Sequence, residues 1–220
     1  MNASLIETLR RKHPGVQIVM ASKYIDAEDF KEYVNAGVKD FGESRVEAFL
    51  QKRPHIDLDI RWHFLGTLQT KKVKKIIHDL DVLHSLDRLK LAKEIEKRRK
   101  EPLACYVQVN ISGEPQKHGI DPEDVPEFLD RVSRFSSIDV VGLMGMAEQT
   151  DDREKIRAQF SLLRKLRDET VKKHPNARGL SMGMSEDYDI ALEEGATVLR
   201  LGRILITEAF YEEKRQEKRV

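Results

Sequence analysis

Short runs rich in apolar and β-branched residues alternate with helical stretches along this 220-residue chain. No linker, low-complexity block or internal repeat interrupts the alternation. Runs of this kind, bounded by polar turn residues, are typical of buried strands. The predicted strands are Gln17–Ala21, Asp40–Gly42, Trp62–Gly66, Val82–Ser85, Ala104–Asn110, Asp139–Met144, Gly179–Met182 and Thr197–Leu201. Because parallel strands need a helical crossover between them, the alternation favours a parallel α/β fold.

The stretches between the strands carry helix start and stop signals. The clearest follows Asp151-Asp152, and its apolar residues recur at intervals of three and four: Ile156, Phe160, Leu163 and Leu166. Another runs from Asp26 to Ala36 and stops at Gly37, the usual residue past a helix end. A third begins at Asp121-Pro122. A short amphipathic helix precedes the first strand. We expect it to cover only thinly the end of the fold at which the strands begin.

Eight is the number of parallel strands that closes a (β/α)8 barrel. The sequence therefore predicts one TIM-like barrel domain over residues 1–220, with a charged helical tail at about 208–220 and no second domain. The main alternative is a doubly wound open sheet. A glycine-rich turn after the first strand would favour that alternative, but Ala21-Ser22-Lys23-Tyr24 contains no glycine.

Charge and cysteine content exclude several classes of function. The chain has 39 Lys and Arg against 38 Asp and Glu, so its formal charge of +1 indicates neither a nucleic-acid-binding protein nor one that binds anionic membranes. The basic run at 71–75 is interpreted as a solvated helix face, because Asp79 and Asp81 follow it. The single cysteine, Cys105, excludes an intrachain disulfide and is predicted to be a small core residue.

No apolar run approaches the length of a membrane span, and the first residues, Met1 to Ser4, lack the core of a signal peptide. We therefore expect a soluble, cytoplasmic protein.

Lys23 follows the first predicted strand, where a barrel enzyme presents groups to its ligand. Lysine is the side chain that forms Schiff bases with carbonyl compounds. By itself, one lysine among many is weak evidence for such a site. A second feature, far along the chain, strengthens it. The seventh strand leads into a segment with hydroxyls, a glycine and a helix start, Leu180 to Asp187, which suits a phosphate group.

The eighth strand adds Arg200, within an otherwise apolar run, and Gly202 at its end. An arginine in such a run needs a partner, and a glycine lets the backbone approach a ligand closely. Since the first and eighth strands of a closed barrel are neighbours, Lys23, Arg200 and Gly202 are predicted to meet at one rim. An amine, a phosphate cradle and an inward arginine together indicate a site for pyridoxal 5'-phosphate.

At this point the chain resembles the pyridoxal phosphate homeostasis protein family, single-domain barrels similar to the N-terminal domain of bacterial alanine racemase. The matching segments run through nearly the whole chain: Ala21–Lys23, Phe41–Val46, Trp62–Gln69, His84–Arg88, Gln108–Ile111, Lys117–Ile120, Gly142–Met144, Leu180–Asp187 and Arg200–Gly202. The resemblance implies that Lys23 is the Schiff-base lysine, that Ser181 and Gly202 hold the phosphate, and that Arg200 faces the pyridine nitrogen.

The chain departs from the family pattern at four places. Ser44 and Lys71 stand where the family usually has asparagine, and Arg203 replaces a small hydroxyl residue after Gly202. The usual Phe-Gly ending is Ile206-Thr207. Of these, Arg203 bears most directly on the phosphate contact.

An arginine at the ring nitrogen disfavours protonation of that nitrogen, so the ring is a poorer electron sink. The expected function is therefore a carrier or buffer of pyridoxal phosphate that serves intracellular homeostasis of the cofactor without robust catalysis, and PLP-dependent apoenzymes are its expected partners. We expect a monomer, because the second domain through which the racemases dimerise is not expected here.

The alternative function is a racemase-like enzyme with a second acid/base. Candidates for that group are Tyr24, next to Lys23, and His63 and His84 at the ends of two strands. A weaker idea is metal binding by the two histidines, for which no cysteine or carboxylate cluster completes a ligand set. The prediction is a site without metal.

Overall fold

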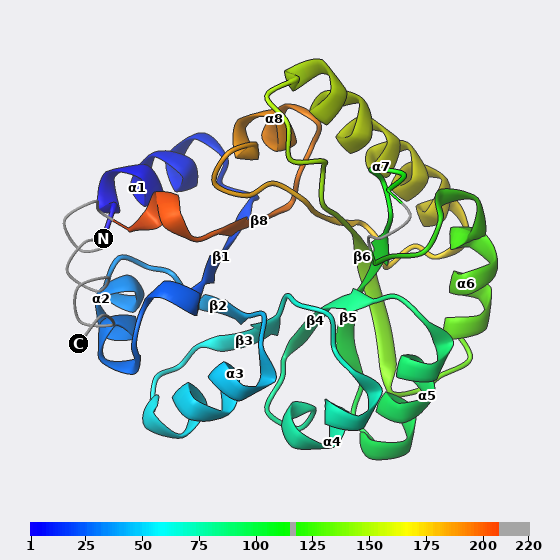
Figure 1. The fold of residues 1–220 in the computed structure, drawn as a ribbon, viewed down its shortest axis with the longest axis horizontal. Coiled ribbons are helices and arrows are strands. Elements are labelled where there is room, and N and C mark those ends of the chain that lie inside the picture. The colour runs from blue at the N-terminus through cyan, green and yellow to red at the C-terminus, as the bar shows by residue number, and fades with distance from the viewer. Residues whose placement is uncertain (115–117, 207–220) are drawn as a thin grey trace.

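The computed structural model describes residues 1–114 and 118–206. Its eight strands form a closed barrel in sequence order, with every neighbouring pair parallel and β8 paired to β1 (Figure 1). The strands are β1 Gln17–Ala21, β2 Asp40–Glu43, β3 Arg61–Phe64, β4 Val82–Leu86, β5 Leu103–Val109, β6 Ile138–Gly145, β7 Gly179–Ser181 and β8 Val198–Leu201. The predicted barrel is confirmed, and each predicted strand coincides with an observed one to within a residue or two at either end.

The helices form an outer ring around the strands (Figure 1). They are α1 Ala3–Lys12, α2 Phe30–Asn35, α3 Val46–Lys52, α4 Val73–Ile76, α5 Leu89–Arg98, α6 Val125–Val132, α7 Arg153–Lys173 and α8 Tyr188–Glu193. The predicted start of α7 is confirmed, because the Asp152 side chain accepts a hydrogen bond from the Lys155 amide. The predicted helix over 26–36 is divided into a 3-10 turn, Ala27–Asp29, and α2, and Gly37 follows it with a φ of 87°.

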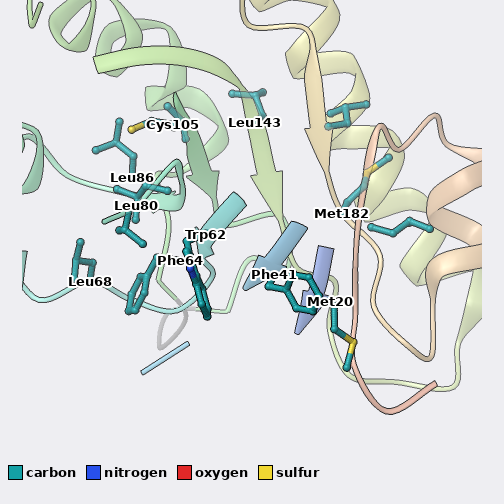
Figure 2. Close-up of a cluster of buried hydrophobic side chains, with 14 of the residues drawn as sticks. Met20, Phe41, Trp62, Phe64, Leu68, Leu80, Leu86, Cys105, Leu143 and Met182 are labelled. Carbon is teal, nitrogen blue, oxygen red and sulfur yellow. The ribbon is translucent and has the colours of Figure 1, made fainter. Parts of the chain in front are cut away.

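Alternation along the strands separates two apolar layers. Residues facing the helices form the main core, which includes Met20, Phe41 and Trp62 together with the fully buried Cys105 (Figure 2). Residues at other positions point into the barrel and form a small second cluster: Val19, Val82, Tyr106, Met144 and Val198. The predicted burial of Cys105 is thereby confirmed.

The amino-terminal end of the barrel is incompletely covered. Helix α1 buries only Ile6 and Leu9, and a cavity of about 440 Å³ lies between this helix and the starts of the first three strands. Its lining includes Gln17 from β1, Asp40 from β2 and Arg61 from β3. The thin cover expected from the short first helix is confirmed.

Within the described residues, no helix has the length and apolar character that crossing a membrane requires. Thr207 and the predicted tail at 208–220 lie outside the described residues, as does Lys117.

Candidate functional site

A cleft of about 970 Å³ opens at the carboxyl end of the strands. It is bounded by the segments that follow β1, β6, β7 and β8 and by the start of α7. The lining residues are Ala21, Lys23, Tyr24, Ala147, Glu148, Gln149, Thr150, Asp151, Arg153, Ile156, Met184, Ser185, Glu186, Asp187, Arg200, Gly202 and Arg203. Three of the four predicted site residues, Lys23, Arg200 and Gly202, therefore share one cleft.

Lys23 lies in a single 3-10 turn, Ser22–Tyr24, that follows β1 directly. Its side chain is exposed, and the Nζ atom lies 4.5 Å from the centre of the Tyr24 ring. A cation over an aromatic face is attracted by the electrons of the ring. Tyr24 thus gives an otherwise mobile amine a defined position at the mouth of the cleft.

A buried ion pair holds the turn from beneath. Lys52 on α3 donates to Glu43 Oε1 at 2.6 Å and to the carbonyl oxygen of Ser22 at 2.5 Å. The Ser22 hydroxyl donates to the same carboxylate oxygen at 2.8 Å. Since the Glu43 side chain is fully buried, its charge depends on Lys52, and the pair fixes the backbone next to Lys23.

Arg200 reaches the cleft from inside the barrel and is 5% exposed. Its guanidinium donates to Ser181 Oγ at 2.7 Å and to the carbonyl oxygen of Gly145 at 3.0 Å. Burial lowers the pKa of Arg200 to about 10, and the nearby charge of Asp187 opposes that shift. No carboxylate of the described residues lies within the 4.0 Å of an ion pair with this guanidinium, so a strong cation faces the cleft with neutral hydrogen-bond partners.

Ser181 is the one predicted residue that the structure places apart from the cleft. It is the last residue of β7, it is fully buried, and its hydroxyl contacts Arg200 and the Nδ1 atom of His84 at 2.8 Å. Ser185, four residues later, lines the cleft instead. Its hydroxyl accepts a hydrogen bond from the Ile204 amide at 3.3 Å, which ties the loop after β7 to the loop after β8.

Sequence reasoning passed over Ser185 because both serines stand in one short block, Ser181 to Ser185. The end of the strand is the signal that separates them. A serine within β7 points into the barrel, whereas one beyond the following turn, which contains Gly183 at a φ of 91°, belongs to the rim.

The departures from the family pattern fall in different places. Ser44 and Lys71 are exposed and do not line the cleft. Arg203 does line it, and its guanidinium pairs with the Glu186 carboxylate across the two rim loops. Arg203 therefore adds a cation to the cleft, and Glu186 partly neutralises it.

The three candidates for a second acid/base do not lie in one place in the structure. His63 and His84 lie inside the barrel, at most 1% exposed, and they bond to each other rather than facing the cleft. Tyr24 is the candidate that lines the cleft beside Lys23. Among the described residues, no group of three histidine, cysteine or acidic side chains is placed to hold a metal ion.

Comparisons with known proteins agree with this geometry. The family model for the N-terminal domain of alanine racemase matches residues 4–208. The pyridoxal phosphate homeostasis protein of Aquifex aeolicus is 40% identical over 200 residues, which span 89% of this chain and 88% of the relative. The protein of the same name from Vibrio cholerae is 34% identical over 209 residues, 91% of this chain and 89% of that relative.

Solved structures show the same relationship. PipY from Synechococcus elongatus, solved without PLP, superimposes with a TM-score of 0.87 at 32% identity, covering 94% of this chain and all of that one. PipY solved with PLP bound gives 0.84 at 31% identity, covering 93% of this chain and 99% of that one. Alanine racemase from Corynebacterium glutamicum shares the fold at 0.76 and 13% identity, over 92% of this chain and 60% of its own. The barrel, the lysine after its first strand and the similarity along nearly the whole chain establish that this protein belongs to the pyridoxal phosphate homeostasis protein family.

Proposed function

We propose that this chain binds pyridoxal 5'-phosphate in the cleft, as a Schiff base on Lys23, and acts in intracellular homeostasis of the cofactor as a carrier or buffer. The observation that carries the proposal is the meeting of an exposed amine, Lys23, with a buried guanidinium, Arg200, in one cleft. The names of the relatives and the PLP-bound state of PipY support it.

The lining residues fit this cofactor. Arg200 offers N–H donors to a ring nitrogen that can only accept when it is unprotonated. A Cβ added to Gly202 would meet nothing closer than Ala21 atoms at 3.5 and 3.6 Å, so the glycine leaves its side of the cleft open to a phosphate group. Ser185 and Arg203 supply a hydroxyl and a cation on the same rim.

When bound, the cofactor would supply an aldehyde group, and Lys23 is the amine that would hold it. The contribution of Arg200 would be electrostatic, because its charge would disfavour a proton on a ring nitrogen placed against it. Because an unprotonated ring withdraws electrons poorly, this arrangement suits holding the cofactor better than carbanion chemistry. We infer that catalysis, where present, is weak.

A racemase-like enzyme is the second candidate, and the presence of Tyr24 in the cleft is the observation that keeps it open. Two-base racemisation needs an acid/base on the face of the substrate opposite Lys23, and Tyr24, whose ring packs against the Lys23 amine, is the candidate in the cleft for that role. The test is incubation with amino acids in deuterated water. Sustained incorporation of deuterium at the α-carbon that depends on Lys23 and Tyr24 would reject the carrier function.

As partners we propose PLP-dependent apoenzymes, with the chain acting as a monomer. Transfer is tested by mixing the loaded protein with an apoenzyme and following the gain of enzyme activity against free cofactor at the same concentration. A size-exclusion mass near twice that of the chain would overturn the monomer.

The cofactor site itself is tested by the visible absorption spectrum with pyridoxal phosphate, then by borohydride reduction and peptide mass mapping. We expect a bound chromophore trapped on Lys23 and lost in Lys23→Ala. Lys31→Ala, which removes an exposed lysine from α2, is the matched control and should retain it. Label spread over surface lysines, or equal loss in both variants, would overturn the proposal.

A further inference from the structure

Six polar side chains form one continuous hydrogen-bonded chain through the interior of the barrel. It begins at the cleft and ends at the opposite, amino-terminal cavity. In order, its members are Arg200, Ser181, His84, His63, Asp40 and Arg61. The successive distances are 2.7, 2.8, 2.8, 3.0 and 2.7 Å. We call this set the barrel relay.

The direction of every hydrogen bond in the barrel relay follows from its two ends. A guanidinium only donates, so Ser181 accepts from Arg200 and gives its own proton to Nδ1 of His84. Burial lowers the pKa of both histidines, which are therefore neutral near pH 7. A neutral His84 that accepts at Nδ1 carries its proton on Nε2 and donates it to Nδ1 of His63.

His63 in turn carries its proton on Nε2 and donates to the Asp40 carboxylate. Arg61 donates to the same carboxylate oxygen from the other side. A carboxylate only accepts, so the series of donations from the cleft ends at Asp40. The four hydrogen bonds from Arg200 to Asp40 thus run one way, from the cation at the cleft to the anion at the far end of the barrel, and Arg61 donates to that anion from the other side.

His84 is held by contacts at both ring nitrogens and on the face of its ring. Its ring stacks on Tyr106, with centroids 4.7 Å apart and planes 25° from parallel. Tyr106 is itself confined, because a Cβ on Gly179 would come within 2.7 Å of its ring. An imidazole held in this way fixes the rotation of the Ser181 hydroxyl, and the hydroxyl fixes one arm of the Arg200 guanidinium.

We propose that the barrel relay holds the Arg200 guanidinium in the orientation that meets the cofactor, and that Ser181, His84, His63 and Asp40 are positioning residues acting through Arg200. The proposal rests on the proposed function. It assigns Ser181 to the support of Arg200 rather than to the phosphate, and it gives Asp40, at the opposite end of the barrel, an effect on cofactor binding.

The tautomers can be tested without cofactor. Imidazole nitrogens of the 15N-labelled protein are observed by NMR at pH 8, with His84→Gln and His63→Gln used to assign the signals. We expect both rings to carry the proton on Nε2. A proton on Nδ1 of either ring would overturn the barrel relay, whatever the protein binds.

The effect on the site is tested with Asp40→Asn, which removes the terminal anion but keeps an acceptor. Asp59→Asn is the matched control, since Asp59 lines the same cavity but pairs with Lys39 outside the barrel relay. We expect Asp40→Asn to shift the absorption maximum of the bound cofactor and to raise its Kd about tenfold, as for a weakened hydrogen bond to a charged group. Asp59→Asn should do neither.

Ser181 provides a second, independent variant. Ser181→Ala should reproduce the spectral shift, and Ser181→Thr, which keeps the hydroxyl, should restore the wild-type maximum. Unchanged spectra and Kd in both Asp40→Asn and Ser181→Ala would overturn the inference and leave the proposed function standing. A wild-type protein that forms no chromophore would overturn the proposed function, and the NMR result alone would then decide whether the barrel relay exists.

Discussion

The Nδ1 atom of His63 lies 2.8 Å from the Nε2 atom of His84, in a part of the barrel that water does not reach. One proton lies between the two facing nitrogens of the neutral rings, and any further proton on the pair would place a charge in the core. Burial accordingly lowers the pKa of each ring, most strongly for His84, whereas the Asp40 carboxylate partly offsets the effect at His63.

Because of this histidine pair, we predict that acid destabilises the fold at a pH above the range in which carboxylates titrate. In the unfolded chain both histidines bind protons near a pKa of about 6.5, whereas in the folded chain they do so only at lower pH. Stability is therefore fully present above about pH 6.5 and is lost as the pH falls below it. Asp40, whose pKa is lowered, adds a further loss below about pH 4.

Urea unfolding at pH 8, 6 and 5 measures this dependence. His84→Gln should be less stable at pH 8 and should show a flatter decline between pH 6.5 and 5. A wild-type free energy of unfolding that is unchanged across that interval contradicts the prediction.

The Glu43–Lys52 pair predicts a large cost for breaking one partner. Lys52→Met leaves the fully buried Glu43 carboxylate without its cation, and we expect a loss of about 3 kcal/mol in the free energy of unfolding. Lys72→Met, which breaks the exposed pair with Glu47, is the control and should change stability little. If the two variants lower the free energy of unfolding equally in urea titrations, the prediction that the buried Glu43–Lys52 pair is the more costly one to break is refuted.

Gly66 is predicted to tolerate no side chain. A Cβ there would lie 2.1 Å from the carbonyl oxygen of Ser44, a backbone atom that cannot move aside cheaply. Gly66→Ala should cost about 1–3 kcal/mol and lower Tm by several degrees. Gly15→Ala, where the new Cβ has nothing within 4 Å, should leave Tm unchanged or raise it slightly. Thermal melts followed by circular dichroism compare the two.

Ser185 and Ser181 are predicted to affect binding differently. Ser185→Ala removes a hydroxyl from the cleft, and we expect it to weaken pyridoxal phosphate about tenfold while leaving unphosphorylated pyridoxal unaffected. Ser181→Ala, which acts through Arg200, should weaken both ligands alike. Kd values from absorption titrations decide the matter. Loss of the phosphate preference in Ser181→Ala alone would return the phosphate role to Ser181.

Cys105 is predicted to be inert until the barrel opens. It is fully buried on β5, and burial raises the pKa of its thiol, so neither access nor thiolate is available to a reagent. A disulfide reagent at pH 8 should label it only at the rate of unfolding, and fully in denaturant. Rapid labelling of the native protein would show that this part of the barrel opens locally.

Most of the barrel is predictable from local sequence. Each strand is a short apolar run whose alternation satisfies an inner and an outer layer, and Asp152 and Gly37 mark helix boundaries by their own backbone preferences. Strand number then implies closure, which is enough to bring Lys23, Arg200 and Gly202 to one rim.

Only the tertiary structure decided which polar side chains contact one another inside the barrel. The predicted end of β7 already places Ser181 within the strand and Ser185 beyond it, but only the closed barrel shows that Ser181 contacts Arg200 and that Ser185 lines the cleft. Asp40, His63 and His84 are each ordinary polar residues in sequence, and they become a directed chain only because closure brings their strands together in one register. Sequence determined the strands and the rim, because backbone preference and hydrophobic period are local. The contacts between buried polar groups are not local, so they exist only in the closed barrel.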